Sequence, residues 1–418
     1  MENFRYRPRG AVALWALVLV GLPAGPSFGE DLTGWPQLRG PQRDGRSTET
    51  GLLRSWPEDG PKEVWRTSIG DGYAGISVHG DRAFTLFNAG EKEVVAAFDT
   101  ATGREVWRTP LGASLETSMG NGPRSTPVVT GDTILTVGSD AVLMALATGD
   151  GKARWSVDLK ARFGSRMPQW GLSGTPLVDG DQVLVEIGGE KAAFAALDLA
   201  SGETRWTAFE SRMGYSSPVV LEVGGVRQYV FVLSATPKVV ALRTDGSLHW
   251  SYDWHGGTIA MPVVVGDDKI FVSASADIGG ALIRIRQEGE KAVVEELWKN
   301  REMKNHFSSS VAFDGHLYGF DNGTLKCLDA ATGERRWVYR GLGKGSLIVA
   351  DDLLIVLGET GKLAIAPATP QGFKPLGQVQ VLQGKTWTSP SLSGGLLFLR
   401  DNQDLVALDL RGREGAGS

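Results

Sequence analysis

The sequence contains a single cysteine and no motif of a common enzyme class. Cys327 stands alone among 418 residues, so the chain cannot form an internal disulfide, and no CxxCH haem-attachment sequence occurs. The five histidines show no metal-ligand spacing, which argues against a structural zinc site. P-loop, nucleophile-elbow and HExxH sequences are absent. The formal net charge is −5 and no basic run occurs, which argues against nucleic acid or an anionic membrane as the main partner.

The apolar run near the N-terminus is too short for a comfortable membrane span. Residues 1–29 combine a basic segment, an apolar run of 12 residues, and small residues at Ser27 and Gly29, which is the plan of a secretory signal peptide. No cysteine follows that could be lipidated. We therefore expect an exported, periplasmic or extracellular protein without a stable membrane anchor after signal cleavage. An uncleaved anchor is the alternative.

Glycine and tryptophan are abundant by contrast, and they recur in one repeated unit. The chain has 56 Gly and 13 Trp. The clearest copy of the unit, KCLDAATGERRW, ends at Trp337 and predicts a strand, a tight turn and a second strand. Asp329 can accept hydrogen bonds from amides of the turn, and Gly333 can take the positive φ that closes it. The predicted structural residues, which include tryptophans that we expect to pack between units, are Asp99, Gly103, Trp107, Trp155, Asp198, Gly202, Trp206, Trp250, Trp298, Asp329, Gly333 and Trp337.

The spacing of the repeats predicts a β-propeller. Tryptophans at the ends of successive units lie 39 to 51 residues apart, which suits four-stranded blades. Most units contain a Ser-Pro, Thr-Pro or similar small element before an apolar run, as in STPVV at 125–129. A lone strand at 62–70 and three strands at 386–410 would complete one composite blade, which removes free strand edges. The predicted fold class is all-β, an eight-bladed propeller closed by its N-terminal strand. Seven blades are the alternative if the irregular seventh unit is not a blade.

The residues before the propeller read as an extended arm. This arm is dense in Gly, Pro and charge, so we expect no strand array there. We expect it to pack on the surface, pinned by Trp35 and Trp56, with Arg39 and Arg43 belonging to that surface. A functional role for the two arginines is the alternative. The predicted organisation is a signal peptide at 1–29, the arm at 30–61, the propeller at 62–410 and a flexible tail at 411–418.

The loops that lead into the innermost strands of a propeller open on one face, around the central channel. In this chain those loops carry aromatic, cationic and imidazole side chains, a mixture that suits a flat or anionic polar ligand. Blade packing alone is the alternative role. No catalytic or metal-binding residue is predicted. The candidate ligand-binding ring consists of Tyr73, Arg124, Trp170, Tyr215, His255, His306, Lys344 and Trp387.

The recurring A-x-D-x-x-[TS]-G-x-x-x-W unit resembles the tryptophan-docking motif of the pyrroloquinoline-quinone (PQQ) propeller superfamily. Residues 97–107, 196–206 and 327–337 carry the motif, with Cys at the Ala position in the last copy. The opening WPQLRGP at 35–41 looks like the leader of exported PQQ-binding-like repeat proteins, many of them named after the outer-membrane assembly lipoprotein BamB. The resemblance covers residues 62–410 and implies either a quinoprotein dehydrogenase or a non-enzymatic scaffold.

The quinoprotein branch implies PQQ with calcium as cofactors, a vicinal cysteine pair, and carboxylates and an amide around the calcium. One cysteine cannot form that pair, and no carboxylate and amide cluster falls at the ring positions. We therefore expect a monomeric, non-catalytic binding or scaffold protein that takes a protein partner or a small polar ligand, with no established cofactor. The alternatives are a PQQ- or quinone-linked periplasmic alcohol or sugar dehydrogenase and, third, a carbohydrate- or sulfate-ester-processing propeller.

Overall fold

The computed structural model describes residues 34–189, 192–212, 214–233, 236–256 and 259–412. All of them belong to one unit, Asp31–Ser418. The signal peptide expected at 1–29 therefore lies outside the described residues. Within the described part of the chain, no helix has the length and apolar character needed to cross a membrane.

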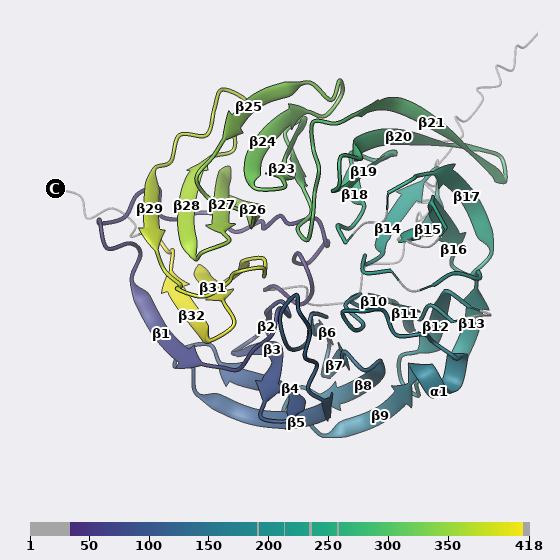
Figure 1. Cartoon of the computed structure of the whole chain (residues 1–418), viewed down its shortest axis with the longest axis horizontal. Helices are drawn as coiled ribbons and strands as arrows, with labels where there is room; N and C mark the ends of the chain where they lie inside the picture. Colours follow the sequence, from purple (N-terminus) through teal and green to yellow (C-terminus); the bar gives the residue numbers. More distant parts are fainter. Residues whose placement is uncertain (1–33, 190–191, 213, 234–235, 257–258, 413–418) are drawn as a thin grey trace, which may run out of the picture. The chain divides into compact units, whose positions relative to one another are not determined.

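Eight four-stranded antiparallel sheets are arranged as blades around one axis (Figure 1). Each of the first four blades takes its strands consecutively from the chain, innermost strand first. Blade 1 consists of β2 (Ser77–His79), β3 (Arg82–Ala89), β4 (Lys92–Asp99) and β5 (Glu105–Ala113), and blade 2 consists of β6 (Val128–Thr130), β7 (Thr133–Val137), β8 (Val142–Ala147) and β9 (Ala153–Asp158). Blade 3 consists of β10 (Leu177–Asp179), β11 (Gln182–Glu186), β12 (Phe194–Asp198) and β13 (Thr204–Ala208), and blade 4 consists of β14 (Val219–Val223), β15 (Val226–Leu233), β16 (Lys238–Arg243) and β17 (Leu248–Asp253).

The second half of the ring repeats this order, except that blade 8 takes its outermost strand from the start of the chain. A five-residue helix, α1 (Leu159–Phe163), follows blade 2. Blade 5 consists of β18 (Val263–Val265), β19 (Lys269–Ala274), β20 (Gly279–Glu288) and β21 (Lys291–Asn300), and blade 6 consists of β22 (Val311–Phe313), β23 (His316–Asp321), β24 (Thr324–Asp329) and β25 (Arg335–Tyr339). Blade 7 consists of β26 (Gly345–Ala350), β27 (Leu353–Gly358), β28 (Lys362–Pro367) and β29 (Gly377–Gln380), and blade 8 consists of β30 (Ser391–Ser393), β31 (Leu396–Arg400), β32 (Asp404–Asp409) and β1 (Glu63–Ser68).

The closure of the ring confirms the fold predicted from the sequence. β1 pairs antiparallel with β32, with Glu63 opposite Leu408, so both ends of the chain contribute to blade 8. The irregular seventh unit forms a complete blade, β26 to β29. The all-β fold with eight blades is therefore correct, and the seven-blade alternative is wrong.

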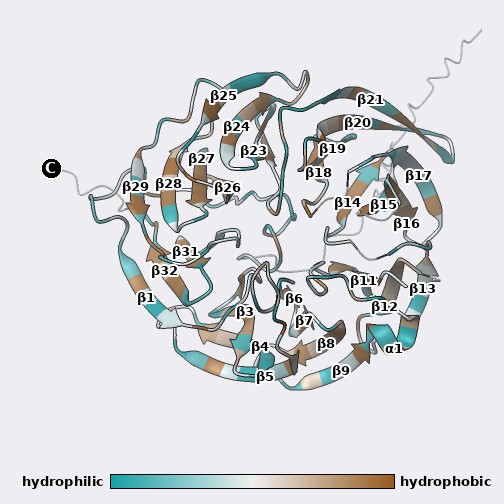
Figure 2. Cartoon of the chain, in the orientation of Figure 1, coloured by the Kyte–Doolittle hydropathy of each residue, from teal (hydrophilic) through white to brown (hydrophobic). Residues whose placement is uncertain are grey.

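Burial differs between the inner and the outer strands of a blade. β7 and β27 are buried along their whole length, because each lies between the sheets of two neighbouring blades. The outermost β13 has no fully buried residue. In Figure 2 the hydrophobic colour accordingly gathers on the middle strands, and hydrophilic patches mark the outer ones.

Tryptophans on outermost strands join a blade to the next one at six junctions. Each indole N–H donates to a backbone carbonyl in the third-to-fourth-strand turn of the next blade, as Trp298 does to Ala330 at 2.9 Å. A Cβ atom at Gly103, in one of these turns, would lie only 2.5 Å from the Trp65 ring, so the close approach requires glycine. The six tryptophans are Trp65, Trp107, Trp155, Trp206, Trp298 and Trp337.

An aspartate shapes the turn that receives each indole at three of these junctions. Asp329 Oδ1 accepts hydrogen bonds from the amides of Ala331 and Thr332, at 2.9 and 3.0 Å. Asp99 and Asp198 bond to the corresponding amides of their own turns. The carboxylate thereby holds the turn open for the tryptophan of the preceding blade.

Two junctions depart from this pattern. Trp250 donates its indole N–H to Gln228 of its own blade rather than to a turn of blade 5. Blade 7 has no tryptophan on β29; there the arm contributes Trp56, whose ring lies against Gly377. The indole N–H of Trp250 therefore bonds within blade 4, while its ring is buried in a cluster that also contains residues of blade 5.

We predict that Trp337→Ala lowers the free energy of unfolding by about 3 to 5 kcal/mol. The indole is 9% exposed, packs against Tyr318 and Phe373, and donates to Thr369 at 2.8 Å. Urea titration measures the loss. The control Leu248→Ala removes a side chain that is 52% exposed and should change the value by less than about 0.5 kcal/mol. Equal values for Trp337→Ala and the control would contradict the docking role.

Glu186, at the end of β11, is a buried carboxyl group without an ion-pair partner among the described residues. Its Oε1 accepts the N–H of Gly214 at 2.5 Å. Burial raises the pKa of this carboxyl from 4.5 to about 8. The folded state therefore holds the proton more tightly than the unfolded chain, so the stabilisation is complete below about pH 4.5 and is lost as the pH rises through about 8.

The variant Glu186→Gln keeps a hydrogen-bond acceptor but cannot ionise. Between pH 5 and pH 8 the stability of the wild type should fall relative to this variant, by on the order of a few kcal/mol. Urea unfolding at several pH values measures the difference. The exposed Glu58 provides the control, since Glu58→Gln should follow the wild type across this range. Parallel pH profiles for the wild type and Glu186→Gln would show that the buried carboxyl does not titrate there.

Candidate functional site

The N-terminal arm fills the central channel. It crosses the middle of the ring in Figure 1, where it is drawn in purple. Trp35 is 1% exposed and pairs with Val78 of β2, and Arg39 and Arg43 are buried farther along the arm. The expectation that the arm packs on the surface is therefore wrong for residues 35–46. Sequence periodicity could not reveal this placement, because the arm is not part of the repeat.

The remainder of the arm follows the ring back to β1. The N–H of Ser47 donates to Val349 of β26 at 2.9 Å. Arg411 pairs with Leu52, and Gly412 donates to Gly51, so two residues assigned to the tail from the sequence contact the arm. Residues 413–418 of that predicted tail lie outside the described residues.

The two arm arginines bind backbone carbonyls at the inner ends of blades. Arg39 donates to Ser309 and Ser310 at 2.9 and 2.6 Å. Arg43 donates to Pro176 at 2.9 Å and to Pro218 at 3.1 Å. Burial lowers the pKa of Arg39 to about 10 and that of Arg43 to about 9, so both remain charged at neutral pH.

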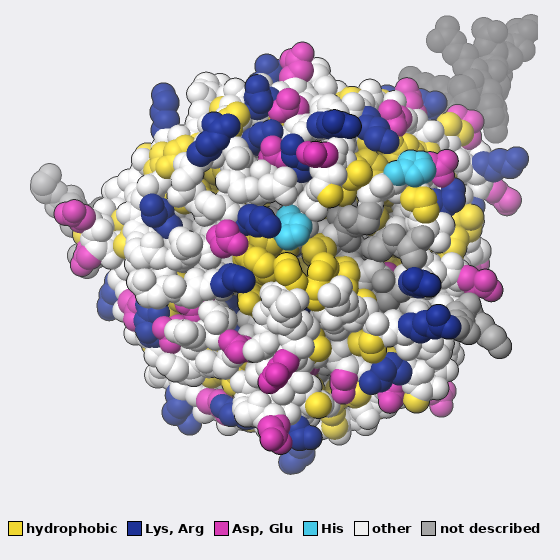
Figure 3. All heavy atoms as spheres, in the orientation of Figure 1, with side chains coloured by type: hydrophobic (Ala, Val, Ile, Leu, Met, Phe, Trp, Pro, Cys, Tyr) yellow, Lys and Arg dark blue, Asp and Glu magenta, His cyan; other side chains and the backbone are white. Residues whose placement is uncertain are grey.

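A pocket opens at the channel mouth, on the face where the loops into the innermost strands lie. We call it the mouth pocket; its volume is about 160 Å³, and the arm residues Leu38 and Arg39 contribute to its lining. Figure 3 shows hydrophobic side chains gathered at the centre of this face. Its aromatic lining residues are Tyr73, Trp170, Tyr215, Phe307 and Trp387, and its hydroxyl-bearing ones are Thr126, Ser173, Thr175, Ser217, Ser308, Ser309, Thr388 and Ser389.

Six of the eight ring residues proposed from the sequence line the mouth pocket together. They are Tyr73, Arg124, Trp170, Tyr215, His306 and Trp387.

The other two residues do not line the pocket. His255 is exposed, because its loop turns Trp254 into the protein and reaches the pocket only later, with Ile259 and Met261. Lys344 directly precedes β26, and its Nζ lies 3.3 Å from Nδ1 of His306 without reaching the pocket. Neither residue belongs to the lining of the mouth pocket, so a role of either in binding stays a prediction.

Sequence reasoning also missed several lining residues. Phe307 follows His306 directly, and Met119 lies in the same loop as Arg124, so loop position was the available signal for both. Leu38 and Arg39 come from the arm, for which no repeat position gave a signal.

Arg124 is a half-buried cation that forms no ion pair among the described residues, although the carboxylate of Glu93 is near enough to act on its charge. Its guanidinium donates to the carbonyls of Gly120 and Gly122, both at 2.8 Å, and lies 5.5 Å from the centre of the Tyr73 ring. Burial lowers the pKa of Arg124. Within the described residues, the pocket lining contains no aspartate or glutamate. The arrangement therefore favours an anionic group over a cationic one.

The aromatic residues form two groups within the pocket. Trp387 stacks on Phe307 with ring centres 4.9 Å apart, and Tyr73 lies 5.6 Å from the same indole. In the other group, Trp170 and Tyr215 have ring centres 5.0 Å apart. The indole N–H of Trp170 is buried and has no hydrogen-bond partner in the described structure. These apolar walls suit a flat group.

His306 lies at the pocket in surroundings that disfavour its charged form. Burial, and then the charge of Lys344, lower the pKa of His306. Trp387 on the neighbouring loop donates its indole N–H to Glu359 at 2.9 Å. The cationic Lys385 lies 4.3 Å from the centre of the same indole ring. Two lysines and the carboxylate of Glu359 thus lie on this side of the pocket, and Glu359 accepts hydrogen bonds from the indole of Trp387 and the backbone N–H of Lys344.

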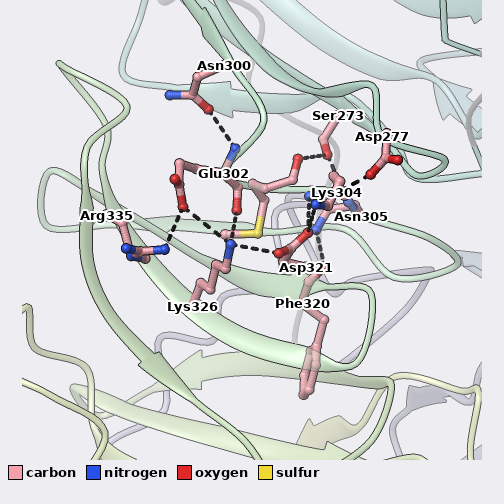
Figure 4. A network of polar contacts seen from close by, with 11 residues as sticks. Ser273, Asp277, Asn300, Glu302, Lys304, Asn305, Phe320, Asp321, Lys326 and Arg335 are labelled. Carbon is pink, nitrogen blue, oxygen red and sulfur yellow. Dashed lines mark hydrogen bonds and ion pairs between the residues drawn. The ribbon is translucent and has the colours of Figure 1, made fainter.

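A polar network anchors the loop that carries His306 and Phe307 (Figure 4). The buried Asn305 donates its side-chain amide to Phe320 and accepts from Ser310, at 3.0 and 2.9 Å. Beside it, Lys326 pairs with Asp321 at 2.6 Å and donates to the carbonyl of Glu302 at 2.7 Å. The bonds join strands of blade 6 to the loop and fix its path.

Hydroxyl groups connect the innermost strands around the pocket. Thr175 Oγ1 accepts the N–H of Thr126 at 3.0 Å, and Ser217 Oγ accepts the N–H of Thr175 at 2.9 Å. Ser309 Oγ accepts the N–H of Met261 at 2.8 Å. The Ser-Pro and Thr-Pro elements seen in the sequence belong to this set, although the pattern alone did not reveal the role of their hydroxyl groups.

The site fits binding better than metal chemistry. Calcium takes six to eight oxygen ligands, often carboxylates. The described lining supplies no carboxylate, and no cluster of three His, Cys, Asp or Glu suited to a metal ion occurs elsewhere in the described residues. The residues present therefore do not fit a calcium-bound quinone.

Comparisons with known proteins agree on one family. The family model for the outer membrane protein assembly factor BamB matches residues 50–208, 91–339 and 190–414, which together span the whole propeller and part of the arm. BamB of Burkholderia pseudomallei is 29% identical to this chain over 375 residues, covering 87% of this chain and 81% of the relative.

Two solved structures show the same fold at low sequence identity. BamB from Moraxella catarrhalis aligns with a TM-score of 0.60 and 16% identity, covering 84% of this chain and 99% of that one. The quinohemoprotein alcohol dehydrogenase from Comamonas testosteroni aligns with a TM-score of 0.61 and 11% identity, covering 92% and 82%. Since the family model extends over far more than half of its length, the chain belongs to the BamB family of PQQ-like β-propellers.

Proposed function

We propose that this protein is an exported, non-catalytic binding propeller that recognises a flat, anionic group at the mouth pocket, presented by a small polar ligand or by a protein partner. The observation that carries the proposal is the pocket itself. Arg124 lies there without a carboxylate partner among the described residues, between aromatic walls, above a channel that the arm fills. Such a cation is stabilised when a ligand supplies the missing negative charge.

Membership of the BamB family supports a role in binding proteins. The relatives are named as outer membrane protein assembly factors, a name that describes assembly and not chemistry. The predicted signal peptide supports export to the compartment in which such a factor works. The lining residues support binding on independent grounds, because they offer stacking surfaces and donors rather than an acid and base pair.

A quinone-linked oxidoreductase is the second candidate. The observation in its favour is the shared fold with the quinohemoprotein alcohol dehydrogenase, together with an aromatic pocket at the channel mouth. The lack of a fit to calcium at this pocket weighs against it, so we rank it second.

A matched series of naphthalene probes tests the proposed charge preference. Naphthalene-2-carboxylate should bind at least tenfold more tightly than the neutral naphthalene-2-carboxamide, and 2-naphthylmethylammonium should bind least. Arg124→Gln should reduce carboxylate binding about tenfold, or ~1.4 kcal/mol, and abolish the preference over the amide. Trp387→Ala should weaken all three probes, because the ring stacks on Phe307 at the pocket. Isothermal titration calorimetry measures the affinities.

The control for this series is Arg286→Gln on β20, which removes an exposed arginine that pairs with Glu295 outside the pocket. It should leave all three affinities unchanged, and none of the three variants should lower the melting temperature by more than a few degrees. If Arg124→Gln and Trp387→Ala bind the probes as the wild type does, the ring is structural and the proposal fails.

Thermal unfolding with PQQ and calcium separates the two candidate functions. A ligand present at 100 times its dissociation constant adds about 2.7 kcal/mol, which means a shift of about 3 °C for a chain of this length. We expect no shift and no reduction of an artificial dye with an alcohol or a sugar. A shift accompanied by dye reduction would make the protein an enzyme and overturn the binding proposal.

A further inference from the structure

The two buried arginines of the arm lie directly beneath three of the loops that form the mouth pocket. Arg43 binds the carbonyls of Thr175, Pro176 and Pro218. Thr175 and Pro176 follow Trp170 in the chain, and Pro218 follows Tyr215. The carbonyls that Arg39 binds belong to the segment that carries His306 and Phe307. One short stretch of the arm thus contacts loops of blades 3, 4 and 6.

The acceptors are unusual for buried cations. Among the described residues, the side chain of Arg43 donates to backbone carbonyls and to the amide oxygen of Gln37. Within the described part of the chain, Arg39 likewise donates to backbone carbonyls, at Arg43, Asp44, Ser309 and Ser310. A planar guanidinium with several donors in a fixed fork fixes both the positions and the directions of these carbonyls. A lysine ammonium at the same place would hold them less specifically.

The bound carbonyls are coupled to the hydroxyl bonds between innermost strands. Arg43 holds the carbonyl of Thr175, and the N–H of the same residue donates to Ser217 at 2.9 Å. Arg39 holds the carbonyl of Ser309, whose hydroxyl accepts the N–H of Met261 at 2.8 Å. Displacement of either guanidinium would therefore loosen a bond that connects two blades at the edge of the pocket.

We propose that Arg39 and Arg43 are positioning residues for the mouth pocket. They act from inside the channel and set the spacing of the loops that carry Trp170, Tyr215 and His306. Arg43 does so from outside the pocket lining, whereas Arg39 also forms part of that lining. The inference deepens the proposed function, since it rests on the mouth pocket being the binding site. The arm is then a component of the site and not only a plug.

Hydrogen exchange of single amides tests this role separately from ligand binding. In Arg43→Lys the amide of Thr175 should exchange at least tenfold faster than in the wild type, and in Arg39→Lys the amide of Met261 should do so. The milder variant Gln37→Ala removes an oxygen that accepts from Arg43 at 3.1 Å and should accelerate Thr175 to a smaller extent. Because Gln37→Ala retains both arginines, the exchange of Thr175 can still be tested if an arginine variant does not fold.

The control is Gly103→Ala, which destabilises the docking of Trp65 in an outer turn between blades 8 and 1. The exchange rates are compared at equal temperature intervals below each melting temperature. Gly103→Ala should leave Thr175 and Met261 at the wild-type rates. If the arginine variants lower the melting temperature but leave both amides at those rates, the arginines only fill the channel and the inference is overturned.

Probe affinity then completes the comparison. Naphthalene-2-carboxylate should bind at least fivefold more weakly to Arg39→Lys and Arg43→Lys, although both variants keep Arg124 and the positive charge of the arm. Full affinity in both variants would contradict positioning. A third outcome separates the two proposals. If the wild type binds no probe but both arginine variants show faster exchange, the arginines hold the loops and the proposed binding function is rejected.

Discussion

Every junction of this ring depends on how closely one blade can approach the next. At most junctions an indole ring lies against a glycine whose turn belongs to the neighbouring blade, as Trp65 does at Gly103. That glycine also has a positive φ, 70° at Gly103. One residue therefore provides both the backbone conformation of the turn and the space for the indole ring. Where the pair is missing, another contact replaces it, such as Trp56 of the arm over Gly377. The regular ring therefore depends on eight local contacts, one at each junction between neighbouring blades.

The arm changes what the ring offers to other molecules. An open channel would present two mouths and a polar wall, whereas the filled channel presents a basin with a floor that includes Leu38 and Arg39. Buried positive charge lies beneath this basin and Arg124 at its side, without a carboxylate in the described lining. The electrostatic preference of the site therefore comes from two parts of the chain that are remote in sequence, a repeat loop and a segment that precedes all the repeats.

The fold could be predicted from the sequence because the residues of the repeat recur at a nearly regular spacing. The tryptophan spacing, the Asp and Gly of the turns, and the strands at both ends are local patterns, and they led to eight blades closed by β1. The site was predicted less completely. Periodicity identifies which loops converge but not how far each one reaches, so His255 and Lys344 were included while Phe307 was missed. The burial of Arg39 depends on long-range packing that no local pattern encodes.

The pairing of Glu63 with Leu408 also orders the folding of the chain. Closing so long a loop costs more entropy than forming a hairpin, so blades 1 to 7, each made from consecutive strands, can form before blade 8. Until the last strands arrive, the strand edges of blade 8 have no partner, and such edges promote aggregation. A chain that ends before β32 would retain β1 as an unpaired strand. Completion of the C-terminus is therefore the step that converts an open, association-prone array into a closed ring.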